Sequence, residues 1–80
     1  MLFGVNDVFG FKGAGIEEIT WQIFNRFGEL MYEGQSMSDR WDGKYQGNRV
    51  QGGVYTVVAG YKVLGEQKRK MFKGYVTVLY

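Results

Sequence analysis

Thirteen glycines and no proline are spread along this chain of 80 residues. At most 12 residues separate one glycine from the next, and a glycine inside a helix costs about 1 kcal/mol relative to alanine. Glycine also adopts positive φ in tight turns without steric cost. The spacing therefore leaves little room for long helices and predicts short strands joined by tight turns.

Between the glycines, apolar and polar residues alternate with the period of two that a half-buried β-strand requires. In residues 18–26, Ile19, Trp21 and Ile23 share one face, and Phe24 interrupts the polar face, which predicts an outward aromatic or a bulge. The same pattern, bounded by turn residues, predicts strands at residues 7–12, 18–26, 29–33, 53–63 and 68–80.

The predicted strands and their turns define the fold class. Residues 34–49 are polar and predict a loop with a turn at Asp42-Gly43, and Phe72 is predicted to be a core residue because it shares a face with Val76 and Val78. Hydrophobic residues make up 45% of the chain, enough for a compact core. The sequence predicts one all-β domain over residues 1–80, a small antiparallel Ig-like β-sandwich of about six or seven short strands.

The composition excludes several kinds of chemistry. Without cysteine and histidine, the chain has no disulfide, no cysteine-bound zinc and no histidine-dependent triad. The glycines of residues 10–15 lack the order of a dinucleotide or phosphate loop. Oxygen ligands without EF-hand spacing occur at Asn6, Asp7, Asp39 and Asp42. We therefore expect a non-catalytic protein with no cofactor and no metal site.

Two binding functions remain as alternatives. A carbohydrate or adhesion module would use Trp41, which Asp39 and Asp42 flank, although a tryptophan folded over the core edge is favoured. A small basic nucleic-acid-binding barrel would use residues 68–73, although a charged strand end that discourages edge pairing is favoured. The formal net charge is only +2, so we expect no nucleic-acid partner.

Five short motifs occur in an order that is found in one protein family. They are Val5–Phe9, Ile23–Gly28, Trp41–Gly47, Gly53–Val57 and Lys73–Val78. In these motifs the chain resembles the gliding-motility-associated C-terminal domain, the type B sorting domain of the type IX secretion system of Bacteroidetes. The resemblance covers roughly residues 5–80.

The resemblance implies a C-terminal sorting domain that directs exported cargo through the periplasm to the cell surface or the medium. Its implied partners are the secretion machinery at the outer membrane and the upstream domains of a longer protein. Three departures stand out: only five residues precede Asn6, Val50-Gln51-Gly52 replaces the usual proline, and Phe27 replaces the usual tryptophan. We therefore expect the family's first strand to be missing.

The motif residues are the candidates for recognition. Trp41 and Tyr55 are expected mainly in the core. Asp42, Gly43 and Gly53 are expected mainly to form turns. Asn25 and Arg26 are the best candidates for an exposed recognition element, with a turn role for Asn25 equally open. The full candidate set is Asn6, Asp7, Asn25, Arg26, Trp41, Asp42, Gly43, Gly53 and Tyr55.

A missing first strand leaves an open sheet edge. Residues 76–80 carry no charge and no proline that would protect such an edge. We expect concentration-dependent self-association, most simply a homodimer through paired strand edges. In the alternative, residues 1–5 fold back over the edge and keep the domain monomeric.

Overall fold

The computed structural model describes residues 2–3, 9–11 and 13–79. For residues 2–3 it describes the backbone and not the side chains. Within these residues the chain is all-β, and no helix is long and apolar enough to span a membrane. The predicted all-β, antiparallel fold class is confirmed. The strands are β1 (Leu2–Phe3), β2 (Ile16–Phe24), β3 (Leu30–Gly34), β4 (Lys44–Tyr45), β5 (Asn48–Arg49), β6 (Gly53–Val63) and β7 (Arg69–Val78).

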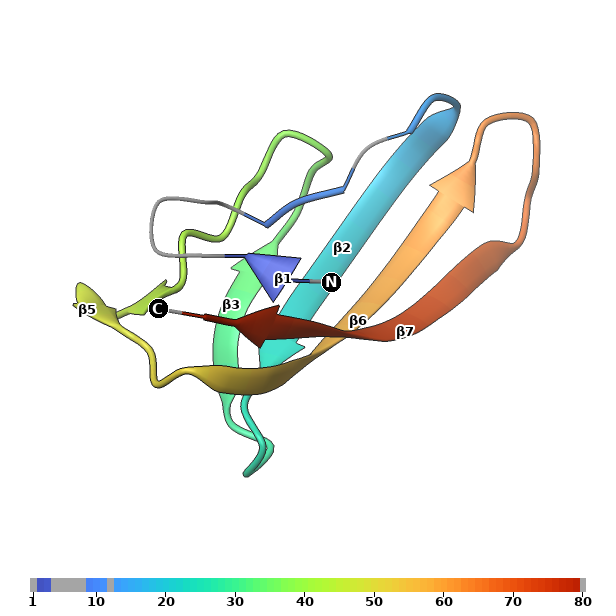
Figure 1. Ribbon diagram of the computed structural model, residues 1–80. Coiled ribbons are helices and arrows are strands. Elements are labelled where there is room, and N and C mark those ends of the chain that lie inside the picture. The colour runs from blue at the N-terminus through green and yellow to red at the C-terminus, as the bar shows by residue number, and fades with distance from the viewer. Residues whose placement is uncertain (1, 4–8, 12, 80) are drawn as a thin grey trace.

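One sheet forms the main layer, with the strand order β1-β7-β6-β2-β3. Strands β7, β6, β2 and β3 are antiparallel neighbours, and the short β1 adds in parallel to the end of β7. The second layer is smaller: the segment between β3 and β6 lies over one face of the sheet and carries the β4–β5 hairpin (Figure 1). We call the two parts the strand layer and the loop layer.

The alternation in β2 sets the core. Ile19, Trp21 and Ile23 are buried, as predicted, whereas Thr20 between them is exposed. The pairing of β2 with β3 shifts register between Ile23 and Phe24, which confirms the irregularity predicted at Phe24. Burial of apolar side chains between the two layers is the main stabilising contribution to such a fold. The buried residues are Phe9, Ile19, Trp21, Ile23, Trp41, Val50, Tyr55, Val57, Ala59, Val76 and Val78.

Gly34, at the end of β3, is required by close packing. It pairs with Trp21 across the sheet, and a Cβ atom at this position would collide with the Trp21 indole. The rings of Phe9, Phe11 and Tyr32 surround the same indole at centroid distances of 5.7, 5.3 and 5.1 Å. These geometries are typical of favourable aromatic pairs.

Three expectations about the strands need correction. Of the predicted strand 7–12, residues 7, 8 and 12 lie outside the described residues, and the described part forms a single bridge from Phe9 to Trp41. The predicted loop 34–49 contains the β4–β5 hairpin. Phe72 is 45% exposed and lies outside the buried core, because its ring lies over Gly74 of the same strand and beside the Phe11 ring, 6.0 Å away.

The edge predicted to be open is covered in part, in the way that the alternative of folded-back residues 1–5 describes. The prediction put it at residues 76–80, but β1 pairs with β7 at Thr77 and Val78. Residues 69–74 of β7 pair with β6 on one side. On their other side, no strand pairs with them in the part of the chain that the structure describes. Self-association through an open edge stays a prediction.

Candidate recognition surface

Asn25 builds the turn between β2 and β3. Its Oδ1 atom accepts hydrogen bonds from the backbone N–H groups of Phe27 and Glu29, both at 2.9 Å. Its Nδ2 atom donates to Oε1 of Glu29 at 2.8 Å. A short amide side chain that satisfies nearby backbone donors is a standard device for holding a tight turn. The turn role that the sequence left open for Asn25 is therefore what the structure shows.

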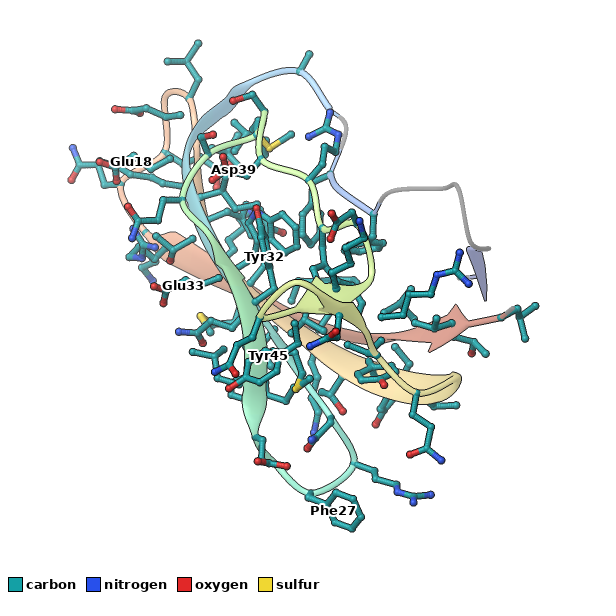
Figure 2. All side chains as sticks on the ribbon, turned by 90° about the vertical axis from the view of Figure 1, so that its left-hand side faces the viewer. Glu18, Phe27, Tyr32, Glu33, Asp39 and Tyr45 are labelled. Carbon is teal, nitrogen blue, oxygen red and sulfur yellow. The ribbon has the colours of Figure 1, made fainter. Side chains whose placement is uncertain are left out.

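Arg26 and Phe27 form the tip of this turn. Both are exposed, Phe27 by 73%, and Figure 2 shows Phe27 at the far end of the turn, pointing away from the sheet. The Arg26 guanidinium carbon lies 4.9 Å from the centroid of the Phe27 ring, a cation–π distance. The exposed guanidinium of Arg26 and the exposed ring of Phe27 are therefore accessible to a partner protein.

Trp41 is fixed in the core by bonds from a loop. Its backbone N–H donates to the Phe9 carbonyl at 2.8 Å and its carbonyl accepts from the Phe9 N–H at 2.7 Å. Its indole Nε1–H donates to the Lys44 carbonyl at 3.0 Å. Only 1% of Trp41 is exposed. The ring is thus unavailable for stacking on a sugar, and the carbohydrate alternative loses the residue on which it depended.

Asp42 and Gly43 shape the start of the β4–β5 hairpin. The Asp42 Oδ1 atom accepts a hydrogen bond from the Lys44 N–H at 3.1 Å. Gly43 has a φ of 78°, and its carbonyl accepts from the Val50 N–H at 2.9 Å, which closes the base of the hairpin. Side chains other than glycine rarely adopt this φ. Both residues act as turn-formers, as their sequence predicted.

Tyr55 and Gly53 join the loop layer to β6. The Tyr55 ring packs edge-on against Trp41 at a centroid distance of 5.5 Å, and its hydroxyl donates to the Gln51 carbonyl. Gly53 begins β6 with a φ of 147° and pairs with Val78 of β7. Trp41 and Tyr55 are therefore the core aromatics that the sequence predicted.

A surface groove of about 390 Å³ lies between the β2–β3 turn, the β4–β5 hairpin and the start of β6. Among the residues that line it are four of the sequence candidates, Asn25, Arg26, Gly53 and Tyr55. We call it the turn–hairpin groove. Trp41 and Asp42 do not line it but hold the hairpin that forms one wall.

Sequence patterns did not single out Tyr45 and Arg49, which also line the turn–hairpin groove. They lie on β4 and β5, on either side of a two-residue turn at Gln46-Gly47, where φ is 52° and 84°. Positive φ at both central residues is the geometry of the tightest hairpins. A glycine between two short polar strands was the available signal for this hairpin.

Tyr32 reports on the contact between the two layers. Burial raises the pKa of the Tyr32 hydroxyl above its usual value of 10.0, and the negative charges of Asp39 and Asp42 raise it further. A hydrogen bond with the Arg40 backbone acts in the opposite direction. Asp39, Arg40 and Asp42 all belong to the loop layer, so the pKa of Tyr32 depends on how that layer packs against the sheet.

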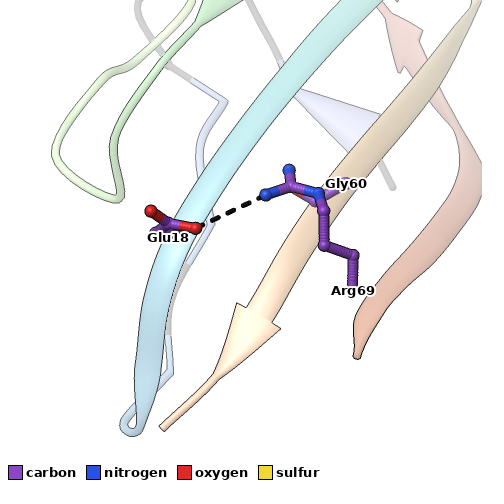
Figure 3. A network of polar contacts seen from close by, with 3 residues as sticks. All are labelled: Glu18, Gly60 and Arg69. Atoms are coloured by element: carbon purple, nitrogen blue, oxygen red, sulfur yellow. Dashed lines mark hydrogen bonds and ion pairs between the residues drawn. The ribbon is translucent and has the colours of Figure 1, made fainter. Parts of the chain in front are cut away.

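The basic residues at the start of β7 are partly neutralised by acidic ones. Figure 3 shows the Arg69 guanidinium between Glu18 and Gly60. Its Nη1 atom lies 3.5 Å from Oε2 of Glu18, and its Nη2 donates to the Gly60 carbonyl at 3.2 Å. Lys70 lies 3.3 Å from Glu66. The expectation of no nucleic-acid partner stays a prediction.

Metal ligation finds no support in the described part of the chain, where no group of three or more acidic side chains could hold an ion. Asp39 instead accepts a hydrogen bond from the Gln35 N–H at 2.7 Å, and Asp42 bonds to Lys44. The candidates Asn6 and Asp7 lie outside the described residues.

Taken together, these features define a small β-sandwich domain that presents a surface groove and turns, with most of its motif residues holding the fold. A family model described as the CHU_C Type IX secretion signal domain matches residues 3–78. The match spans nearly the whole chain, so the chain belongs to this family of type IX sorting signals, and the family suspected from the motifs is confirmed. Comparison with curated proteins and with solved structures found no match.

Proposed function

We propose that this domain directs a cargo protein attached to it through the type IX secretion system to the cell surface or the medium. The family match over residues 3–78 carries the proposal. The cargo would be the upstream part of a longer protein, and it would cross the periplasm before it meets the machinery at the outer membrane. The role is that of a signal and requires no catalysis and no cofactor.

Recognition would depend on the folded surface and not on a linear code. Asn25, Trp41 and Tyr55 are far apart in the sequence and contribute to one end of the molecule only through the turn, the hairpin and β6. Most of these residues hold backbone shape, so the shared motif describes a scaffold. The exposed groups that this scaffold presents are those at the turn–hairpin groove, including Arg26 and Tyr45.

The test is a fusion of this domain to the C-terminus of a periplasmic reporter, expressed in a host with a working type IX system. We expect the reporter at the cell surface or in the medium, and we expect it to stay in the periplasm when the secretion system is deleted. A fusion carrying Trp21→Ala provides the unfolded control and should not be exported. A folded wild-type fusion that stays in the periplasm of the competent host would refute the proposal.

A further inference from the structure

We propose that two copies of this domain associate face to face, through the side of the sheet that is turned away from the loop layer. We call this surface the outer face; it is formed by the residues that alternate with the core residues of β2, β6 and β7, and by Leu30 and Glu33 of β3. The inference goes beyond the sorting function, because it concerns how two copies of the chain meet. It also differs from the edge pairing expected from the sequence, which uses the backbone of a strand edge.

A row of four side chains crosses the outer face and carries a charge at each end. Lys73 of β7 pairs with Val58 of β6, and Val58 pairs on its other side with Gln22 of β2. Gln22 pairs in turn with Glu33 of β3. Residues that pair across strands share one face of the sheet. Val57, next to Val58 in the chain, is buried in the core, so the row lies on the opposite face.

Both charged residues of this row are exposed to solvent. Neither Lys73 nor Glu33 belongs to an ion pair among the residues that the structure describes. The Glu33 carboxylate accepts a hydrogen bond from Nε2 of Gln22 at 3.0 Å, which holds it on the outer face without neutralising its charge. Three strand spacings separate Lys73 from Glu33, about 14 Å at the usual spacing, so the two residues of one copy are too far apart to pair with each other.

The neighbouring row on the outer face is mostly apolar. Its cross-strand pairs join Leu30 to Phe24, Phe24 to Thr56 and Thr56 to Tyr75. Leu30 and Tyr75 are exposed, and so is Val54, which lies beside Thr56 on the same face. Exposed apolar side chains that lie together mark interaction surfaces, whereas scattered ones are normal. The outer face therefore combines an apolar strip with a cation on one side and a carboxylate on the other.

The two charges select both the partner and its orientation. In a twofold dimer both copies use the same surface. A twofold axis parallel to the strands, placed between the two outer faces, brings β7 of one copy over β3 of the other, so that Lys73 faces Glu33. The same axis places Tyr75 over Leu30. An axis across the strands would bring β7 over β7 and Lys73 over the same lysine of the second copy, and like charges in such positions oppose association.

The selected orientation agrees with the geometry of stacked sheets. An axis parallel to the strands keeps the strands of the two copies aligned, as in sandwiches whose sheets pack face to face about 10 Å apart. Extended lysine and glutamate side chains can meet across that distance. A partner with a single sign of charge is a poorer occupant, because one row of the outer face carries both signs. A second copy carries both signs in matching positions.

Sedimentation velocity over a wide range of concentration measures the association, and we expect a dimer of the parent protein. Lys73→Glu should weaken the dimer by about tenfold or more, and Glu33→Lys should do the same, because each brings like charges together at both contacts. Lys44→Glu changes the net charge as Lys73→Glu does, but at an exposed position of the loop layer, and should leave the dimer intact. A parent that stays monomeric, or equal weakening by Lys44→Glu, would overturn the proposal.

A mixture of the two charge-reversed variants tests the orientation. With Lys73→Glu in one chain and Glu33→Lys in the other, a mixed dimer has opposite charges at both contacts, so association should recover in the mixture alone. Both positions are exposed, so each variant should melt like the parent, which shows that a lost dimer is not a lost fold. A mixture that associates no better than the separate variants would overturn the proposed contact.

Cross-linking separates the outer face from the strand edge as the interface. The chain has no cysteine, so introduced cysteines can be joined by a short bismaleimide without competing thiols. We expect a cross-link when the Tyr75→Cys and Leu30→Cys proteins are mixed, and none in either protein alone. In a dimer paired through β7 edges, β3 of one copy lies several strands away from β7 of the other. A dimer that gives no mixed cross-link would therefore overturn the outer face as the interface.

Discussion

The two tryptophans represent the two layers of the molecule, and each is only 1% exposed. Trp21 lies inside β2, where the alternation of the strand turns it toward the core. Trp41 lies in the loop layer, where a backbone bridge to Phe9 and the Nε1–H bond to Lys44 hold it. Equal burial thus arises from a periodic pattern in one layer and from individual polar bonds in the other.

This difference teaches where the domain tolerates change. The strand layer gains its stability from many similar apolar contacts, whereas the loop layer depends on a few specific hydrogen bonds. Substitutions that remove apolar volume should act most strongly in the strand layer. Substitutions that remove one donor or acceptor should act locally in the loop layer and its neighbouring turn.

The largest effect is expected from Trp21→Ala. The substitution removes an indole that contacts three aromatic rings and packs on Gly34, and should lower the free energy of unfolding by about 3–5 kcal/mol. For a domain of this size the loss approaches the whole stability. Urea unfolding followed by circular dichroism measures it. Phe27→Ala, at an exposed position, is the control, and equal stability of the two variants would contradict the assignment of Trp21 to the core.

A smaller and more local effect is expected from Trp41→Phe. The ring remains apolar, but the Lys44 carbonyl loses its indole donor, which should cost about 1–2 kcal/mol. Hydrogen exchange at the Val50 N–H, which bonds to Gly43 at the hairpin base, should become faster. Trp21→Phe is the matched control, because the Trp21 Nε1–H bond to Ser36 is long at 3.4 Å. Unchanged exchange at Val50 would show that the indole bond does not hold the hairpin.

The turn between β2 and β3 should respond less. Asn25→Ala removes the acceptor of two backbone N–H groups, and we expect a loss of about 1 kcal/mol. Asn25→Asp keeps the acceptor oxygens and should recover part of the loss. Arg26→Ala should change stability by less than about 0.5 kcal/mol, because its side chain is exposed. Thermal melts of the three variants measure these losses of stability. An Arg26→Ala variant destabilised as much as Asn25→Ala would contradict the expected order.

The smallest effect concerns Tyr32, which lies between the layers. Its pKa is raised in the folded state, so the folded protein holds the phenol proton more tightly than the unfolded chain does. This contribution is present in full below pH 10.0 and is lost as the pH rises above that value. Tyr32→Phe should remove that part of the alkaline loss of stability. Asp39→Asn should lower the Tyr32 pKa, and an unchanged tyrosinate titration would show that the loop layer does not pack beside it.

Much of the strand layer was determined by the sequence alone. The period of two in residues 18–26 identified Ile19, Trp21 and Ile23 as core residues, and all three are buried. Asp42-Gly43 predicted a turn, because short acceptor side chains and positive φ are local properties of the chain. The order of five motifs predicted the family, which the match over residues 3–78 confirmed.

The tertiary structure decided the features that depend on which segments meet. Phe72 has the alternation of a core residue, yet it is 45% exposed, because a strand pattern marks a face but not how far the second layer covers it. The parallel pairing of β1 with Thr77 and Val78 depends on which strand lies at the sheet edge. The turn–hairpin groove brings Arg26 and Arg49 to one cavity across 23 residues of chain (49 − 26), a juxtaposition that no local pattern encodes.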